Sequence, residues 1–131
     1  MDQADVAAVG AQRRAEPGGA RPADEDWVRT LAGQGREHDR AVERLHALLL
    51  RACRAEVGRR APRIGLTGRD VDDLAQEAAP DATVAVLAKL STFRGESLFT
   101  TWAYAFAVFE VSAAIGRHLR RTVGVRLDDH A

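Results

Sequence analysis

Apolar residues recur at intervals of three and four positions along most of this chain, and this spacing predicts amphipathic α-helices. In residues 36–60 one stripe is formed by Ala41, Leu45, Leu48, Leu49 and Ala52. In residues 70–90 the corresponding stripe is formed by Val71, Leu74, Ala75, Ala78, Ala82 and Ala85. Val and Ile rarely alternate with polar residues, so the pattern typical of strands is missing from the sequence. We therefore predict an all-α fold.

Four helices are expected. A short one spans about residues 24–31, and a long one ends where Pro62 and Gly65 interrupt the pattern. The third helix contains Pro80, which removes one backbone hydrogen bond and should bend the helix or divide it in two. After a loop, the fourth helix spans about residues 97–121.

These helices define one small domain of residues 24–121, a bundle of three to four helices. Residues 1–23 contain Pro and Gly with only scattered small apolar side chains, so we predict a disordered N-terminal tail. Residues 122–131 are interpreted as the start of an interdomain linker.

Cysteine usage and hydropathy suggest a location. Cys53 is the only cysteine, which excludes an internal disulfide and is typical of a reducing compartment. The sequence also shows no apolar run that approaches membrane-spanning length and no N-terminal signal pattern. We expect a cytoplasmic protein without membrane insertion.

Charge is distributed in blocks, although the 19 basic and 19 acidic residues balance. Residues 27–69 carry ten basic and four acidic residues, and residues 70–90 carry one basic and five acidic residues. Two surfaces for different partners would explain this distribution. Solvated helix faces without a partner would explain it equally well.

Five of the seven aromatic residues lie within residues 90–106. At helical spacing Phe99, Trp102, Phe106 and Phe109 share one face, so we predict that they build the core. Tyr104 lies off this face beside small and polar residues, which predicts an accessible ring.

Accessible rings near arginine suit single-stranded nucleic acid, because bases stack on rings and guanidinium groups hold phosphates. Tyr104 is the candidate ring for base contact that this pattern suggests. The arginines available for phosphate contact are Arg94, Arg117, Arg120 and Arg121.

Three motifs in order carry a family resemblance: "DDLAQE" at residues 72–77, "FRGES" at 93–97 and "FTTWAY" at 99–104. Together they resemble region 2 of the extracytoplasmic-function (ECF) sigma factors of bacterial RNA polymerase. The resemblance covers about residues 40–121 and is closest to an actinobacterial branch of the family. It implies the helical bundle of sigma region 2, without a cofactor or catalytic activity.

The resemblance also implies partners. The acidic helix would bind the clamp helices of the β′ subunit of core RNA polymerase, through Asp73, Leu74, Gln76 and Glu77. The loop and the helix after it would bind the melted, single-stranded −10 element of promoter DNA. Phe93, Arg94, Trp102 and Tyr104 map to that DNA site. An anti-sigma factor is the expected regulator.

The chain departs from the family pattern after Tyr104. Two positions that are usually basic hold Ala105 and Val108, and Phe109 replaces an Asn that often helps to hold a flipped base. The helix-turn-helix of region 4, which binds the −35 element, is absent, as expected of a two-domain factor cut at its linker; a natural single-domain protein would lack it as well. The alternative is a helical interaction module that mainly binds an anti-sigma regulator, with DNA contact weakened or lost.

Metal and enzyme chemistry are not expected. His38, His46 and Cys53 share a sector of the second helix, but eight residues of helix rise about 12 Å, too far for one ion. Asp73 and Glu77 form a possible carboxylate pair, yet the sequence offers no nucleophile–base pair or phosphate-binding loop with it. We predict no metal site and no enzyme.

Overall fold

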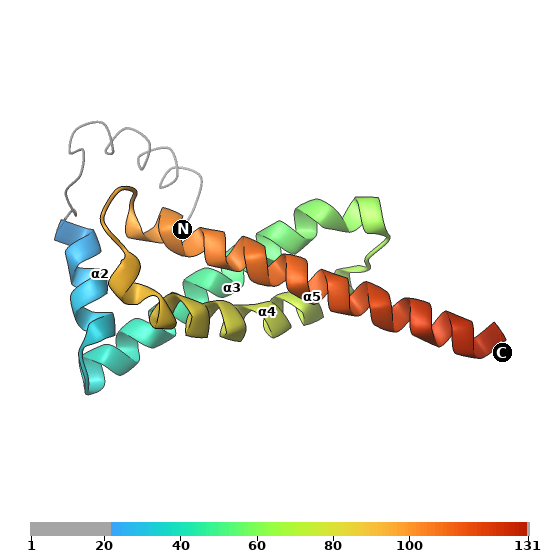
Figure 1. The fold of residues 1–131 in the computed structure, drawn as a ribbon, viewed down its shortest axis with the longest axis horizontal. Helices are drawn as coiled ribbons and strands as arrows, with labels where there is room; N and C mark the ends of the chain where they lie inside the picture. Colours follow the sequence, from blue (N-terminus) through green and yellow to red (C-terminus); the bar gives the residue numbers. More distant parts are fainter. Residues whose placement is uncertain (1–21, 131) are drawn as a thin grey trace.

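The computed structural model describes the backbone of residues 22–130 and the side chains of residues 23–124. Within this part of the chain the regular structure is entirely helical, which confirms the all-α prediction. The elements, shown in Figure 1, are α2 (Pro22–Ala32), α3 (Arg36–Ile64), α4 (Gly68–Ala88), the short 3₁₀ helix η1 (Leu90–Thr92) and α5 (Phe99–His130). The predicted tail, residues 1–23, lies almost entirely outside the described residues.

Helices α3, α4 and α5 pack against one another, and α2 packs on α3 at the end of the bundle where α5 begins (Figure 1). The larger core side chains come mainly from α3, where Leu45, Leu49 and Val57 are fully buried. The partner helices contribute mostly small side chains: Ala75, Ala78, Ala79 and Ala82 from α4, and Ala103 and Ala107 from α5. Small residues let helix axes approach closely, so the core is thin and tightly packed.

Two prolines lie inside helices and end neither of them. Helix α3 continues through Pro62 and ends at Ile64. Gly65 ends the helix as predicted, in the left-handed conformation (φ 68°) that glycine adopts without strain. Helix α4 is not divided at Pro80 but runs unbroken from a capping box formed by Thr67 and Asp70.

Helix α5 is longer than predicted. It begins at Phe99 and continues to His130, beyond the predicted end at residue 121. Gly124 is a weak stop signal by itself, and the sequence has no proline after Pro80 that would end the helix. The segment interpreted as the start of a linker is therefore helical through residue 130.

Helix α5 also contradicts the expectation that no segment is apolar enough to span a membrane. Its stretch Phe99–Gly124 has sufficient length and apolar composition, although a third of the most apolar window is buried inside the bundle. A core helix of a soluble protein passes the same test, so this composition is weak evidence for a membrane.

Candidate nucleic-acid and protein interfaces

An aromatic cluster joins three separate elements at the start of α5. Trp27 of α2 stacks on Phe99, with ring centroids 5.2 Å apart. Phe93, from the loop before α5, meets Phe99 edge-on at 5.5 Å and lies 5.2 Å from Trp102. Trp102 in turn contacts Phe106 at 4.9 Å. Such pairs add stability beyond the area they bury, so the cluster fixes the loop and α2 against α5.

The prediction that Phe99, Trp102, Phe106 and Phe109 form one core face is only partly correct. Phe99 is fully buried, and Trp102 and Phe106 are half-buried. Phe109 is 70% exposed, so its assignment to the core was wrong. The buried side of α5 is formed by Phe99, Ala103, Ala107, Val111 and Ala114. The sequence analysis missed this face because it followed the large aromatic residues and not the small ones.

Asp24 connects α2 to the first residue of α5. Its carboxylate is 3% exposed, and Oδ1 accepts a hydrogen bond of 2.9 Å from the backbone N–H of Phe99. A negative charge at a helix N-terminus is favourable, because the first N–H groups have no partner within the helix. The sequence gave no signal for this contact, which joins residues 75 positions apart.

The FRGES loop presents Arg94 to solvent. Gly95 adopts a positive φ of 75°, a conformation that other residues rarely adopt, and its backbone is buried. Phe93 points into the aromatic cluster while Arg94 is exposed, and within residues 23–124 Arg94 forms no ion pair. The loop is therefore held in place by the ring of Phe93 and exposes the guanidinium group of Arg94 to solvent.

Tyr104 is half-buried and bound to α3, which differs from the accessible ring that we predicted. Its hydroxyl donates to Oε1 of Glu56 (3.3 Å) and accepts from Nη2 of Arg59 (2.5 Å). Glu56 is 8% exposed and also forms ion pairs with both Arg59 and Arg60. Arg60 donates to Oγ of Ser112 on α5 at 2.8 Å.

These contacts form a polar network between α3 and α5 that the sequence analysis missed. The available signal was an acidic residue followed three and four positions later by arginine, a spacing that places such side chains together on a helix. The arginine that contacts Tyr104 is thus Arg59 of α3, whereas the sequence analysis considered Arg94, Arg117, Arg120 and Arg121.

The predicted polymerase-binding residues of α4 divide between core and surface. Asp73 and Gln76 are exposed and Glu77 is half-exposed. Leu74 is 3% exposed and belongs to the hydrophobic core, so its predicted surface role is corrected: it holds α4 in place from inside. Asp70 caps its own helix, and hydrogen bonds from the backbone and side chain of Thr67 lower its pKa.

Glu77 and Arg117, assigned by sequence to different partners, face one another. Oε2 of Glu77 lies 3.6 Å from Nη2 of Arg117, and this buried oxygen accepts no hydrogen bond from residues 23–124. Both side chains remain more than a third exposed, so the pair contributes at most about 1 kcal/mol. Glu77 therefore already has a partner of opposite charge within the chain, on α5.

The arginines near the end of α5 are distant from the ring cluster. Arg120 and Arg121 are exposed, and Arg117 is 15 residues beyond Trp102, which corresponds to about 22 Å along a helix. The structure thus brings the rings of Phe93 and Trp102 together, and Arg94 follows Phe93 in the loop, while Arg117, Arg120 and Arg121 lie farther along α5.

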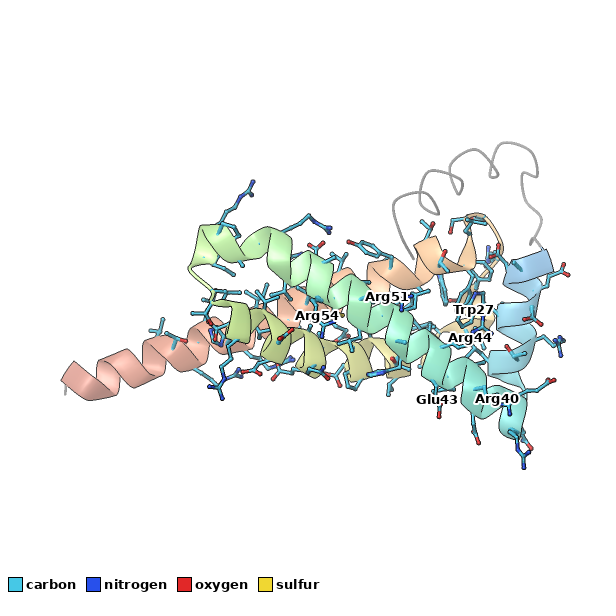
Figure 2. All side chains as sticks on the ribbon, turned by 180° about the vertical axis from the view of Figure 1, so that it is seen from behind. Trp27, Arg40, Glu43, Arg44, Arg51 and Arg54 are labelled. Carbon is cyan, nitrogen blue, oxygen red and sulfur yellow. The ribbon has the colours of Figure 1, made fainter. Side chains whose placement is uncertain are left out.

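A stripe of arginines follows the outer face of α3 (Figure 2). Arg44 lies over the ring of Trp27, with Cζ 4.7 Å from the centroid. At the other end Arg54 forms an ion pair with Asp72 of α4 at 3.0 Å. Arg51 lies between these two arginines and Arg40 lies before Arg44. Both are exposed, and neither forms an ion pair inside the described region. The basic and acidic blocks of the sequence therefore form adjoining surfaces.

The structure offers no metal centre within residues 23–124, since no three ligating side chains come together there. Cys53 is fully buried, and burial, with a contribution from Glu110, raises the pKa of its thiol to about 11. The nitrogen Nδ1 of His38 lies 3.1 Å from the carbonyl oxygen of Leu31, which gives this histidine a structural contact.

Comparison with known proteins found no family model that matches this chain. No curated protein and no solved structure matches it either.

Proposed function

We propose that this chain is the region 2 domain of an ECF-type sigma factor, which binds core RNA polymerase and captures the melted −10 strand of a promoter. The observation that carries the proposal is the order of three motifs, an acidic helix, an FRGES loop and an FTTWAY helix start. Polar or charged side chains of the first two motifs reach the surface, while their apolar members anchor them in the core.

The polymerase-binding surface would be the outer side of α4. Asp73 and Gln76 are exposed there, and Glu77 is restrained by Arg117. Exposed carboxylates on one helix face repel one another, and a basic partner helix would relieve that repulsion. Leu74 would act indirectly, by fixing the helix that carries these side chains.

The DNA surface would consist of the FRGES loop and the first two turns of α5. Phe93 and Trp102 are half-buried, so each leaves part of its ring available for a flipped base. Arg94 is exposed beside them and would hold a phosphate. Tyr104 would contribute its ring from a position fixed by Glu56 and Arg59.

Binding to an isolated β′ clamp-helix fragment tests the proposal, with Glu77→Lys as the disruptive variant. Since Glu77 contacts Arg117, the matched control is Arg117→Gln, which breaks the ion pair without reversing charge on α4. We expect saturable binding that Glu77→Lys abolishes and Arg117→Gln retains. Equal affinity of a folded Glu77→Lys variant would refute the assignment.

The exposed position of Phe109 favours a second candidate, a helical interaction module with weakened DNA contact. Ala105, also exposed, stands where the family usually has a basic residue. Salt dependence separates the two functions, because phosphate-mediated binding weakens steeply with salt and apolar helix packing does not. The module would bind its partner equally well at 50 mM and at several hundred mM salt, by this principle.

A further inference from the structure

The outer side of α3 carries arginines and almost no acidic residue. Four residues, which we call the α3 stripe, share this side at helical spacing (Figure 2): Arg40, Arg44, Arg51 and Arg54. All four are exposed. Glu43, which borders the stripe, is the only acidic residue between positions 40 and 55. Like charges three or four positions apart on a helix repel one another, so the stripe favours an anionic partner.

Two of these arginines are held in position by neighbouring elements. Arg44 lies over the ring of Trp27, with Cζ 4.7 Å from the centroid. A guanidinium group that stacks on a ring keeps its N–H donors available for a phosphate. Arg54 forms an ion pair with Asp72 of α4 at 3.0 Å. The remaining two arginines form no ion pair within residues 23–124, so their charges are available to a partner.

The surface between the arginines is formed by small residues. Ala47 and Ala55 are exposed there, and a side chain added at Gly58 would meet nothing within 4 Å. None of the exposed large hydrophobic residues of the described part of the chain lies on α3. Protein partners bind mainly through buried aromatic or aliphatic anchors, whereas a phosphate backbone binds through charge alone. The stripe therefore fits nucleic acid better than an acidic protein.

We propose that the α3 stripe binds the phosphate backbone of duplex DNA independently of its sequence. Residues 40–54 rise about 21 Å along α3, and each strand of a duplex carries one phosphate per about 3.4 Å of its axis, so each arginine can contact a different phosphate. Phe99 stacks on one face of the Trp27 ring and Arg44 covers the other. The stripe thus offers cations without a ring on which an unpaired base could stack, which favours a duplex over a single strand.

The acidic side of α4 determines where the duplex lies. Asp72 pairs with Arg54, and Asp73 is exposed beside it, so both carboxylates would repel phosphates that approached α4. The duplex therefore contacts mainly the other three arginines of the stripe, with Arg54 at its edge. Three to four phosphate contacts predict that log K falls with log salt at a slope of about −2.7 to −3.6. This surface is separate from the FRGES loop, and the proposal does not rest on the sigma-factor function.

Fluorescence anisotropy of a short labelled duplex of arbitrary sequence, titrated with the full chain at several salt concentrations, tests the proposal. The disruptive variant combines Arg40→Gln with Arg51→Gln. The matched control combines Arg63→Gln with Arg69→Gln, which removes the same charge from two exposed positions outside the stripe. At about 0.1 M salt the disruptive variant should bind about 60-fold more weakly, with a slope less steep by about 1.8, because two phosphate contacts are lost. The control should keep the slope of the wild type.

Several results would overturn the proposal. A folded wild type that does not bind the duplex would do so, and so would a salt slope that the disruptive variant leaves unchanged. Polyglutamate of equal charge that displaces the duplex as well as unlabelled duplex does would assign the stripe to an acidic protein. Loss of single-strand binding alone, with duplex binding intact, would assign the stripe to the surface proposed for the −10 strand. Circular dichroism checks that both variants fold. None of these measurements involves the β′ subunit, so failure of this proposal is distinguishable from failure of polymerase binding.

Discussion

Replacement of Tyr104 by Phe removes the phenolic hydroxyl and keeps the ring, so it separates the structural role of this residue from its proposed role in DNA binding. The hydroxyl contacts Glu56 at 3.3 Å and Arg59 at 2.5 Å. Hydrogen bonds to charged groups contribute about 1.5–3 kcal/mol when they are buried. Tyr104 is half-buried and Arg59 is exposed, so water replaces part of this interaction. We expect Tyr104→Phe to lower the free energy of unfolding by about 1 kcal/mol.

DNA binding should respond differently. If bases stack on the ring, Tyr104→Phe should bind single-stranded −10 DNA as the wild type does, whereas Tyr104→Ala should lose about 1–3 kcal/mol of binding free energy. Urea unfolding followed by circular dichroism measures the stability. Fluorescence anisotropy of a labelled oligonucleotide, at one fixed salt concentration, measures the affinity.

Two results would refute this reasoning. A Tyr104→Ala variant that loses less than a few tenths of a kcal/mol of DNA affinity would remove Tyr104 from the DNA site. A double-mutant cycle of Tyr104→Phe with Glu56→Gln should give a coupling energy of about 0.5–1 kcal/mol, and additive effects would show that the hydroxyl does not stabilise the helix pair.

Other predictions concern the core and the helix cap. In urea unfolding, Phe109→Ser should change the stability by less than about 0.5 kcal/mol, whereas Phe99→Ala should cost about 3–5 kcal/mol because Phe99 is fully buried. Cys53 should not react with thiol reagents at neutral pH in the folded chain, since its pKa is raised to about 11; rapid labelling without denaturant would contradict this. The pKa of Asp70 is lowered from 3.8, so its contribution to stability is present above about pH 4 and is lost as the pH falls through the lower folded value. Asp70→Asn should therefore be less stable than the wild type at neutral pH and equally stable in strong acid, and a difference independent of pH would argue against the capping interaction with Thr67.

The helices could be predicted from the sequence because their apolar stripes are regular, but the orientation of α5 could not. The large rings predicted the wrong buried face for α5. The face that is buried carries Ala103 and Ala107, whose small side chains allow α5 to approach α3 and α4. The helical spacing of the large rings assigned Phe109 to the core, whereas close helix packing selects small side chains. Pairings between helices, such as Glu77 with Arg117, depend on the packing angle and had no local signal.

In the candidate sites, too, local features could be predicted from the sequence and contacts between distant residues could not. Exposed positions such as Asp73 and Arg94 follow from helix and loop patterns. The hydrogen bonds between Asp24 and Phe99 and between Glu56 and Tyr104 could not be predicted in this way. They join residues that are 75 and 48 positions apart, which only the folded chain brings together.

Titration of the full chain against the β′ clamp-helix fragment tests the central claim most directly. Glu77→Lys is the disruptive variant and Arg117→Gln the control. The sigma-factor account predicts saturable binding that survives Arg117→Gln and is lost in a folded Glu77→Lys variant. Absence of binding by the folded wild type would contradict that account.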